Sequence, residues 1–228
     1  MSMKKLCSVI LTFVILVVTV FSVNASAAEI TKTEALFEKI NTSKEVTVTL
    51  RTGKGKELGS DYGVTSTVYL KGDELAFDLN NGFVNMRAVA TEDKIVGFIT
   101  SFPFFYLEIA SPFTTDDGMW GVIEELSDIT MDFLYHVDDY NETVNGTEYY
   151  VEEFNDREYV TSKFYYIDDE LKMLRVEDVQ KKTVQYTYFD EISFEVDDSV
   201  FDTPVFAINV TPIMKIFFSS LIGTLIPA

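Results

Sequence analysis

Residues 164–175 read FYYIDDELKMLR, and the fold class follows from this stretch. Aromatic and aliphatic residues occupy both ends, and Asp168-Asp169-Glu170 between them is typical of a tight turn. The pattern predicts a hairpin made of strands over 159–167 and 171–178. Similar segments recur on both sides of this hairpin at spacings of about 8 to 12 residues, which is typical of an antiparallel meander.

Toward the N-terminus the apolar residues also follow a period of two. Val46, Val48 and Leu50 alternate with Thr, and Asn80-Asn81-Gly82 is a strong turn signal before a strand expected over 83–90. This pattern predicts about eleven strands before Pro204. The fold class is therefore mainly β, in the α+β sense, since two helices are also expected.

The first helix is expected to begin at Thr31, because Thr31 and Glu34 have the spacing of a capping box, and to end near Ser43. The second helix interrupts the meander partway along the chain. Its apolar residues, from Met119 to Ile129, follow helical spacing, and acidic residues fall on the other side.

The N-terminus has the features of a secretory signal peptide over residues 1–27. A short basic start precedes an apolar run, and Ala25-Ser26-Ala27 forms a small-x-small cleavage site. An uncleaved membrane anchor is the alternative interpretation of this run. Cys7 is too far from the cleavage site to become a lipidated first residue. The protein is therefore expected to be secreted or to reside in the extracytoplasmic cell envelope of a bacterium.

The charge balance excludes several classes of function. The chain of 228 residues carries 18 Lys+Arg against 37 Asp+Glu, one His and one Cys. An acidic surface repels phosphate backbones, so nucleic acid is not an expected partner. One His and one Cys cannot build a multi-histidine or cysteine-rich metal site. No metal and no cofactor are expected, and the sequence does not define the oligomeric state.

The residues that could take part in catalysis or metal binding can each be explained by an ordinary structural role. His136 lies in an expected strand, and no nucleophile motif accompanies it. Pairs of acidic residues fall mostly at expected turns, where solvated carboxylates are ordinary. Residues 138–142 are the best candidate for a calcium loop, yet they lack the ligand spacing of an EF-hand. No enzymatic activity is expected, although a carboxylate-dependent hydrolase remains a third hypothesis.

Two segments favour the binding of an apolar ligand. The run from Ser101 to Leu107 contains Phe102, Phe104, Phe105 and Tyr106, and it predicts either a strand buried on both faces or the wall of an apolar pocket. The tail over 213–228 is mostly apolar but too short to span a bilayer as a straight helix. We expect it to fold back over the sheet or to contact a membrane surface.

The layout of the chain resembles that of the lipoprotein-carrier superfamily, which includes LolA-like and mycobacterial LppX- and LprG-like proteins. The resemblance rests on the Asp-containing hairpin over 164–175, the TYFDEI segment over 187–192, and the DDSVFDTP segment over 197–204. It implies an unclosed antiparallel barrel with a few helices on its concave side and an apolar cavity for acyl chains. The domain is expected to span residues 28–212.

The sequence therefore predicts a non-enzymatic envelope protein that binds a lipid or a lipoprotein acyl chain. The expected ligand-binding residues are aromatic or otherwise apolar, namely Phe102, Phe104, Phe105, Tyr106, Met119, Trp120, Phe217 and Phe218. The alternative is a sensor or protein-interaction module whose core is filled by its own side chains.

Overall fold

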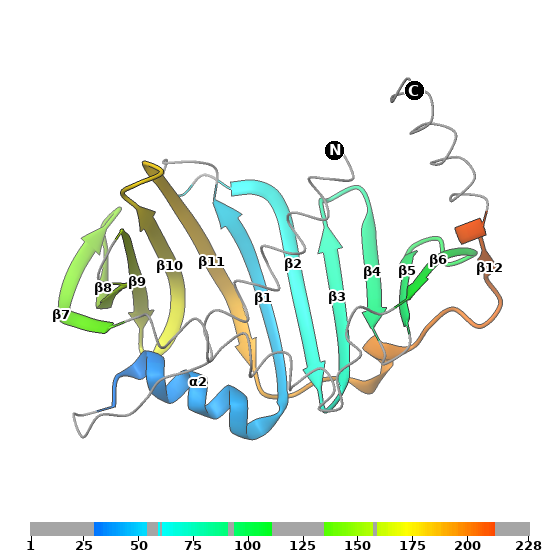
Figure 1. Ribbon diagram of the computed structural model, residues 1–228, viewed down its shortest axis with the longest axis horizontal. Coiled ribbons are helices and arrows are strands. Elements are labelled where there is room, and N and C mark those ends of the chain that lie inside the picture. The colour runs from blue at the N-terminus through cyan, green and yellow to red at the C-terminus, as the bar shows by residue number, and fades with distance from the viewer. Residues whose placement is uncertain are drawn as a thin grey trace, which may run out of the picture.

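The computed structural model describes residues 30–53, 59, 61–90, 94–110, 135–156 and 159–212. Within these ranges the chain forms a twelve-stranded sheet with one α-helix packed against it (Figure 1). The predicted signal peptide, the predicted second helix and the tail over 213–228 lie outside the described residues. No described helix is long and apolar enough to cross a membrane.

The described residues form strands β1 to β12. Their bounds are β1 (Glu45–Gly53), β2 (Asp61–Lys71), β3 (Glu74–Asn80), β4 (Asn85–Ala90), β5 (Lys94–Ile99), β6 (Phe105–Ala110), β7 (Tyr135–Val144), β8 (Thr147–Asn155), β9 (Val160–Ile167), β10 (Glu170–Asp178), β11 (Thr183–Ser193) and β12 (Ile208–Asn209).

The order in the sheet is β12-β6-β5-β4-β3-β2-β1-β11-β10-β9-β8-β7. Two meanders, β1–β6 and β7–β11, therefore join along the antiparallel pair of β1 and β11. All other neighbours are antiparallel except β12 and β6, which run parallel. Because β7 and β12 end a linear order, the sheet is not closed into a barrel. This confirms the predicted unclosed antiparallel meander.

The helix α2 (Lys32–Ser43) lies across one face of the sheet, which we call the helix face (Figure 1). It begins as predicted, because the Thr31 side chain accepts a hydrogen bond from the Glu34 amide and Glu34 accepts one from the Thr31 amide. Phe37 and Ile40 point into the core, where the Phe37 ring meets the Phe164 ring edge-on at 6.1 Å.

A buried carboxylate fixes the start of α2 against β8. Glu152 has no exposed surface, and its two oxygens accept hydrogen bonds from the Lys32 and Thr33 amides at 2.6 and 2.8 Å. The first amides of a helix lack partners within the helix and carry partial positive charge, so a carboxylate stabilises them. The Thr33 hydroxyl also lies 2.8 Å from the Tyr166 hydroxyl. These contacts set where the helix crosses the sheet.

The main core lies on the helix face, between α2 and the central strands. Strand alternation explains its composition, because every second residue of a strand points to the same face. Val48, Val68 and Phe77 form one such row across β1, β2 and β3. The row continues into β8–β10 through Phe154, Phe164 and other large buried side chains.

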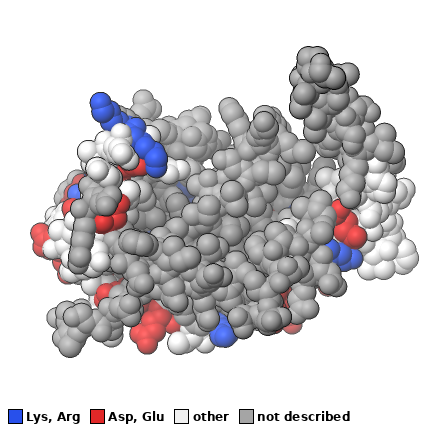
Figure 2. Space-filling view, in the orientation of Figure 1, with Lys and Arg blue, Asp and Glu red and all other residues white. Residues whose placement is uncertain are grey.

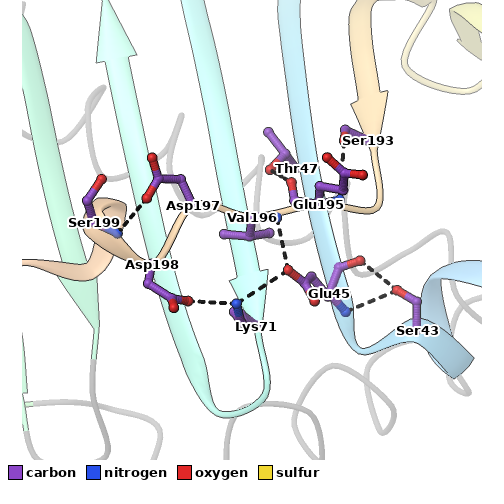
Figure 3. Close-up of polar contacts among 10 residues, drawn as sticks. All are labelled: Ser43, Glu45, Thr47, Lys71, Ser193, Glu195, Val196, Asp197, Asp198 and Ser199. Atoms are coloured by element: carbon purple, nitrogen blue, oxygen red, sulfur yellow. Dashed lines mark hydrogen bonds and ion pairs between the residues drawn. The ribbon is translucent and has the colours of Figure 1, made fainter.

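After β11 the chain crosses to the opposite face and travels to the far edge of the sheet. Polar contacts hold this crossing segment at the edge of the sheet where β1 begins and β2 ends (Figure 3). Lys71 binds Asp198 at 2.6 Å and Glu45 at 3.5 Å, and Glu45 accepts a hydrogen bond from the Val196 amide. The one-turn helix η1 (Asp198–Phe201) then buries Val200 and Phe201 against β3 and β4.

Two local expectations differ from the structure. Residues 138–142, considered above as a calcium loop, belong to β7, and the described residues contain no group of acidic, His or Cys side chains that could hold a metal ion. In place of the two strands that the sequence pattern suggests over 183–189 and 192–196, the structure has the single strand β11, which runs through residues 190–191 and ends at Ser193. Asp190 is an extra residue opposite Thr49 and Leu50, and such a bulge interrupts the alternation without ending the strand.

Candidate functional site

The turn between β5 and β6 carries an exposed aromatic cluster, made of Phe102, Phe104 and Phe105. The Phe102 ring lies 4.8 Å from the Phe104 ring and 5.9 Å from the Phe105 ring. Between 44% and 59% of the surface of each residue is exposed. The sequence analysis expected these three residues in one ligand-binding set, and in the structure their rings are in contact.

Strand alternation divides the predicted aromatic residues between two faces. Leu107 pairs with Gly97, which pairs with Ala88 and through it with Phe77 of the main core. Leu107, and Phe105 two residues before it, therefore lie on the helix face. Tyr106 pairs with Phe98, which packs on the opposite face. Tyr106 is therefore separated from Phe105 by the thickness of the sheet.

On the helix face of β4–β6, large apolar side chains remain accessible to solvent. We call Met86, Ile99, Phe105 and Leu107 the apolar strip, and each is 38–44% exposed. Met86 pairs with Leu79 of the core on one side and with Ile99 on the other, so the strip continues the core toward the edge of the sheet. A soluble protein rarely leaves such a continuous apolar surface open without a function for it.

The middle of the strip is lined by small residues. Ala88 and Gly97 pair with each other between Phe77 and Leu107, and both are partly exposed. A Cβ atom built on Gly97 would meet only the Arg87 carbonyl oxygen, at 3.9 Å. This position therefore has room for a side chain that the sequence does not supply. These two small residues lie between the larger apolar residues Phe77 and Leu107.

The position and length of α2 explain why this helix does not cover the apolar strip. The Glu152 carboxylate holds the start of the helix at β8, and the helix ends at Ser43, directly before β1. A helix of 12 residues spans about 18 Å, which covers about four strands at their usual spacing. Strands β4–β6 lie beyond its reach.

The last described residues run along the outer side of β6. The Ile208 amide donates to the Phe104 carbonyl at 2.8 Å, and the Val210 amide donates to the Tyr106 carbonyl at 3.0 Å. The Thr211 hydroxyl accepts a hydrogen bond from the Glu108 amide. The last described segment before the tail over 213–228 therefore lies next to the strand that carries Phe105 and Leu107.

A separate pocket of about 580 Å³ lies between α2 and β10–β11. Leu36, Leu171, Phe189 and Ile192 contribute apolar walls. Its rim is charged, because Lys32, Lys39, Lys172, Asp169, Glu170, Asp190 and Glu191 also line it. Lys32 and Lys172 form ion pairs with Asp169 and Glu170, respectively. No described residue of the predicted binding set lines this pocket.

The opposite face carries ion pairs that stabilise neighbouring strands. Arg87 binds Asp78 through two hydrogen bonds of 2.7 Å. Desolvation by burial, followed by the nearby Asp78 carboxylate, raises the pKa of the Tyr69 hydroxyl, which donates to Asp78.

A second polar group on this face links β7, β8 and β9. Lys163 donates to Tyr140 at 2.7 Å and lies 3.0 Å from Glu153. Burial acts to lower the pKa of Lys163, but the hydrogen bonds to Tyr140 and Glu153 outweigh it and raise that pKa. Burial also raises the pKa of the nearby Tyr165 to about 12. These groups lie away from the apolar strip.

His136 lies in β7 as predicted, and its Nε2 atom lies 2.7 Å from the Asp139 carboxylate. Its ring packs edge-on against Phe154 at 5.3 Å, so the side chain has a structural role at the edge of the sheet. Four of the predicted binding residues, Met119, Trp120, Phe217 and Phe218, lie outside the described residues.

Sequence reasoning missed Met86, Ile99, Leu107 and Gly97 as neighbours of the aromatic cluster. Each belongs to a strand whose existence was predicted, so the signal was present in the alternation of β4, β5 and β6. The pairing register that brings them side by side is a property of the folded sheet.

Comparisons with known proteins return similar structures but no matching sequence. No protein-family model matches the chain, and no curated protein matches it. An uncharacterized conserved protein from Thermus thermophilus is 9% identical with a TM-score of 0.43, over 79% of this chain and 99% of that one. A LolA superfamily protein from Nitrosomonas europaea is 12% identical with a TM-score of 0.33, over 75% and 97%.

An outer membrane lipoprotein-sorting protein domain from Vibrio parahaemolyticus is also 12% identical, with a TM-score of 0.30, over 74% of this chain and 94% of that one. The superfamily that the sequence resembles is thus among the structural matches. At these identities and TM-scores the similarity concerns the fold alone, and the function of this chain is inferred from its own residues.

Proposed function

We propose that this chain is an exported, non-enzymatic protein of the cell envelope that binds a lipid or an acyl chain on the apolar strip. The observation that carries this proposal is the continuous exposure of Met86, Ile99, Phe105 and Leu107 beside a buried core. An acyl chain lying on these residues would remove apolar surface from water on both partners.

The mechanism is desolvation, without a covalent step. Each methylene group that leaves water contributes about 0.8 kcal/mol, so several methylenes on the strip give useful affinity. Phe102, Phe104 and Phe105 would border one end of the bound chain. We propose that Met119, Trp120, Phe217 and Phe218 contribute to the same site from their segments, as expected from the sequence.

The test adds a side chain at Gly97, in the middle of the apolar strip. The Gly97→Leu substitution places an isobutyl group between Ala88 and Leu107, where a Cβ atom fits without a close contact. The proposal predicts that Gly97→Leu lowers the affinity for a fluorescent fatty acid by about tenfold, the equivalent of losing one or two buried methylenes. The melting temperature is expected to stay close to that of the wild type.

The matched control is Thr143→Leu, which adds a leucine at an exposed position of β7, at the opposite edge of the sheet. This variant is expected to bind the fatty acid as the wild type does. Equal loss in both variants, or no loss in Gly97→Leu, would show that the strip is not the binding site. Absence of fatty-acid binding in the wild type would favour the interaction module instead.

A further inference from the structure

One end of the sheet presents aromatic side chains that contact little of the protein. Phe83, in the turn between β3 and β4, is 96% exposed, and Phe206, just before β12, is 97% exposed. Val205 beside it is 86% exposed, and Phe102 and Phe104 are more than half exposed. These five residues form what we call the apolar tips.

The tips come from three segments that lie side by side. The Thr100 amide donates to the Asn85 carbonyl at 3.0 Å, which joins the β5–β6 turn to the start of β4. The Ile208 amide donates to the Phe104 carbonyl, which joins the β5–β6 turn to the segment before β12. The apolar tips therefore belong to one continuous end of the molecule.

The fold does not require the Phe83 ring. The turn is held by its asparagines, because Asn80 accepts from the Gly82 amide and Asn81 accepts from the Phe83 and Val84 amides. Gly82 supplies the left-handed backbone of the turn, with a φ of 81°. A fully exposed phenylalanine on a turn that is already stable exposes apolar surface to water with no gain in folding.

The three segments carry no charge in a strongly charged chain. Residues 81–86, 99–107 and 203–212 contain no Asp, Glu, Lys or Arg, although the chain has 37 acidic and 18 basic residues and a net charge of −19. Figure 2 shows a group of uncharged residues at the right-hand edge, where β6 and β12 lie, with acidic and basic residues next to it. An acidic protein is repelled by an anionic membrane, and an uncharged end is the part that can approach one closely.

We propose that the apolar tips dock this protein on the surface of a phospholipid bilayer, with the rings of Phe83, Phe102, Phe104 and Phe206 inserted into the interfacial layer. Rings that project from turns need no matching groove in a fluid bilayer, whereas a protein partner must supply one. Binding would depend on buried apolar area and little on the charge of the lipid. This inference holds whether or not the apolar strip binds a lipid.

The experiment is vesicle flotation of the exported protein with two kinds of vesicle, phosphatidylcholine alone and phosphatidylcholine mixed with phosphatidylglycerol. The wild type is expected to bind both. The double variant Phe83→Ser/Phe206→Ser is expected to bind both at least about tenfold more weakly, because two rings no longer leave water. Both side chains are almost fully exposed, so the melting temperature should not change.

A matched pair of valines provides the control. Val205→Ser removes an apolar tip, and Val179→Ser makes the same change at the 67% exposed turn between β10 and β11. Vesicle binding is expected to weaken in Val205→Ser and to stay unchanged in Val179→Ser. The double variant should retain wild-type affinity for the fluorescent fatty acid, and Gly97→Leu should retain vesicle binding, so the two proposals fail separately.

Three outcomes would overturn the docking proposal. The first is a wild type that does not float with either vesicle. The second is a double variant that floats as well as the wild type, which would place membrane contact elsewhere, for example in the tail over 213–228. The third is a wild type that is dimeric by light scattering and a double variant that is monomeric, with neither binding vesicles, which would make this end an interface between copies.

Discussion

Replacing Glu152 by glutamine tests how α2 is held on the sheet. The carboxylate is completely buried, and both of its oxygens accept amide hydrogens from the first turn of the helix, at 2.6 and 2.8 Å. Glutamine has almost the same shape, but its NH2 group would face one of these two amide donors. One charge-assisted hydrogen bond is therefore lost, and a buried amide is left without an acceptor.

The size of the effect follows from these contacts. A hydrogen bond to a charged group contributes about 1.5–3 kcal/mol. The lost interaction of the charge with the helix N-terminus adds about 0.3–2 kcal/mol. Since a neutral amide is easier to bury than a carboxylate, part of this loss is offset. We expect Glu152→Gln to lower the free energy of unfolding by about 2 kcal/mol, which corresponds to about 4–8 °C in melting temperature.

Thermal unfolding followed by circular dichroism at neutral pH measures this change. Glu148→Gln, at an exposed position of the same strand, is the control and is expected to stay within about 0.5 kcal/mol of the wild type. Hydrogen exchange of the Lys32 and Thr33 amides should accelerate in Glu152→Gln. A Glu152→Gln protein as stable as the wild type would refute the view that this carboxylate anchors α2.

Three further outcomes are expected. Burial acts to raise the pKa of Glu153, but hydrogen bonds from Lys163 and Tyr140 lower it below its ordinary 4.5. Its contribution to stability is therefore present above pH 4.5 and lost as the pH falls through the folded-state pKa. Melting curves of Glu153→Gln should show a smaller loss of stability between neutral and acid pH than the wild type. Added salt should raise the melting temperature, because it screens repulsion in a chain of net charge −19, and a flat response would contradict this. Truncation after Pro212 removes Phe217 and Phe218 and should therefore weaken fatty-acid binding, whereas unchanged fatty-acid binding with loss of vesicle binding would make the tail a membrane contact instead.

The sequence predicted the strands well where one face is buried and the other is not. In β1–β3 the apolar residues face the core and the residues between them face the other side of the sheet. Their alternation therefore identifies the strands, as Val46, Val48 and Leu50 do for β1. Edge strand β7 was predicted only in part, over 132–137, because the polar composition of residues 138–142 is also typical of a loop. The β11 bulge at Asp190 was not predicted, because the sequence pattern left Asp190 and Glu191 between two separate strands. The Asp190 carboxylate in fact binds Arg51 of β1.

The sequence named apolar residues around the β5–β6 turn as a binding set, and their role in binding stays a prediction. The structure places Phe102, Phe104 and Phe105 beside one another and Tyr106 on the opposite face of β6. Which face each residue occupies follows from the register of the folded sheet, which the sequence does not define. The role of Glu152 was not predicted. Glu152 lies between Tyr150 and Phe154 on a buried face, and a glutamate at such a position needs hydrogen-bond partners. Those partners, the Lys32 and Thr33 amides, lie about 120 residues away in the sequence.

The most direct test of lipid binding is native mass spectrometry of the protein purified without detergent from the envelope or medium of its own host. If the apolar strip holds a lipid or an acyl chain, the spectrum will show the protein with an added mass that organic extraction removes, and Gly97→Leu will carry less of it. A wild-type spectrum containing only the unliganded polypeptide, from cells in which the protein is abundant, would contradict the account.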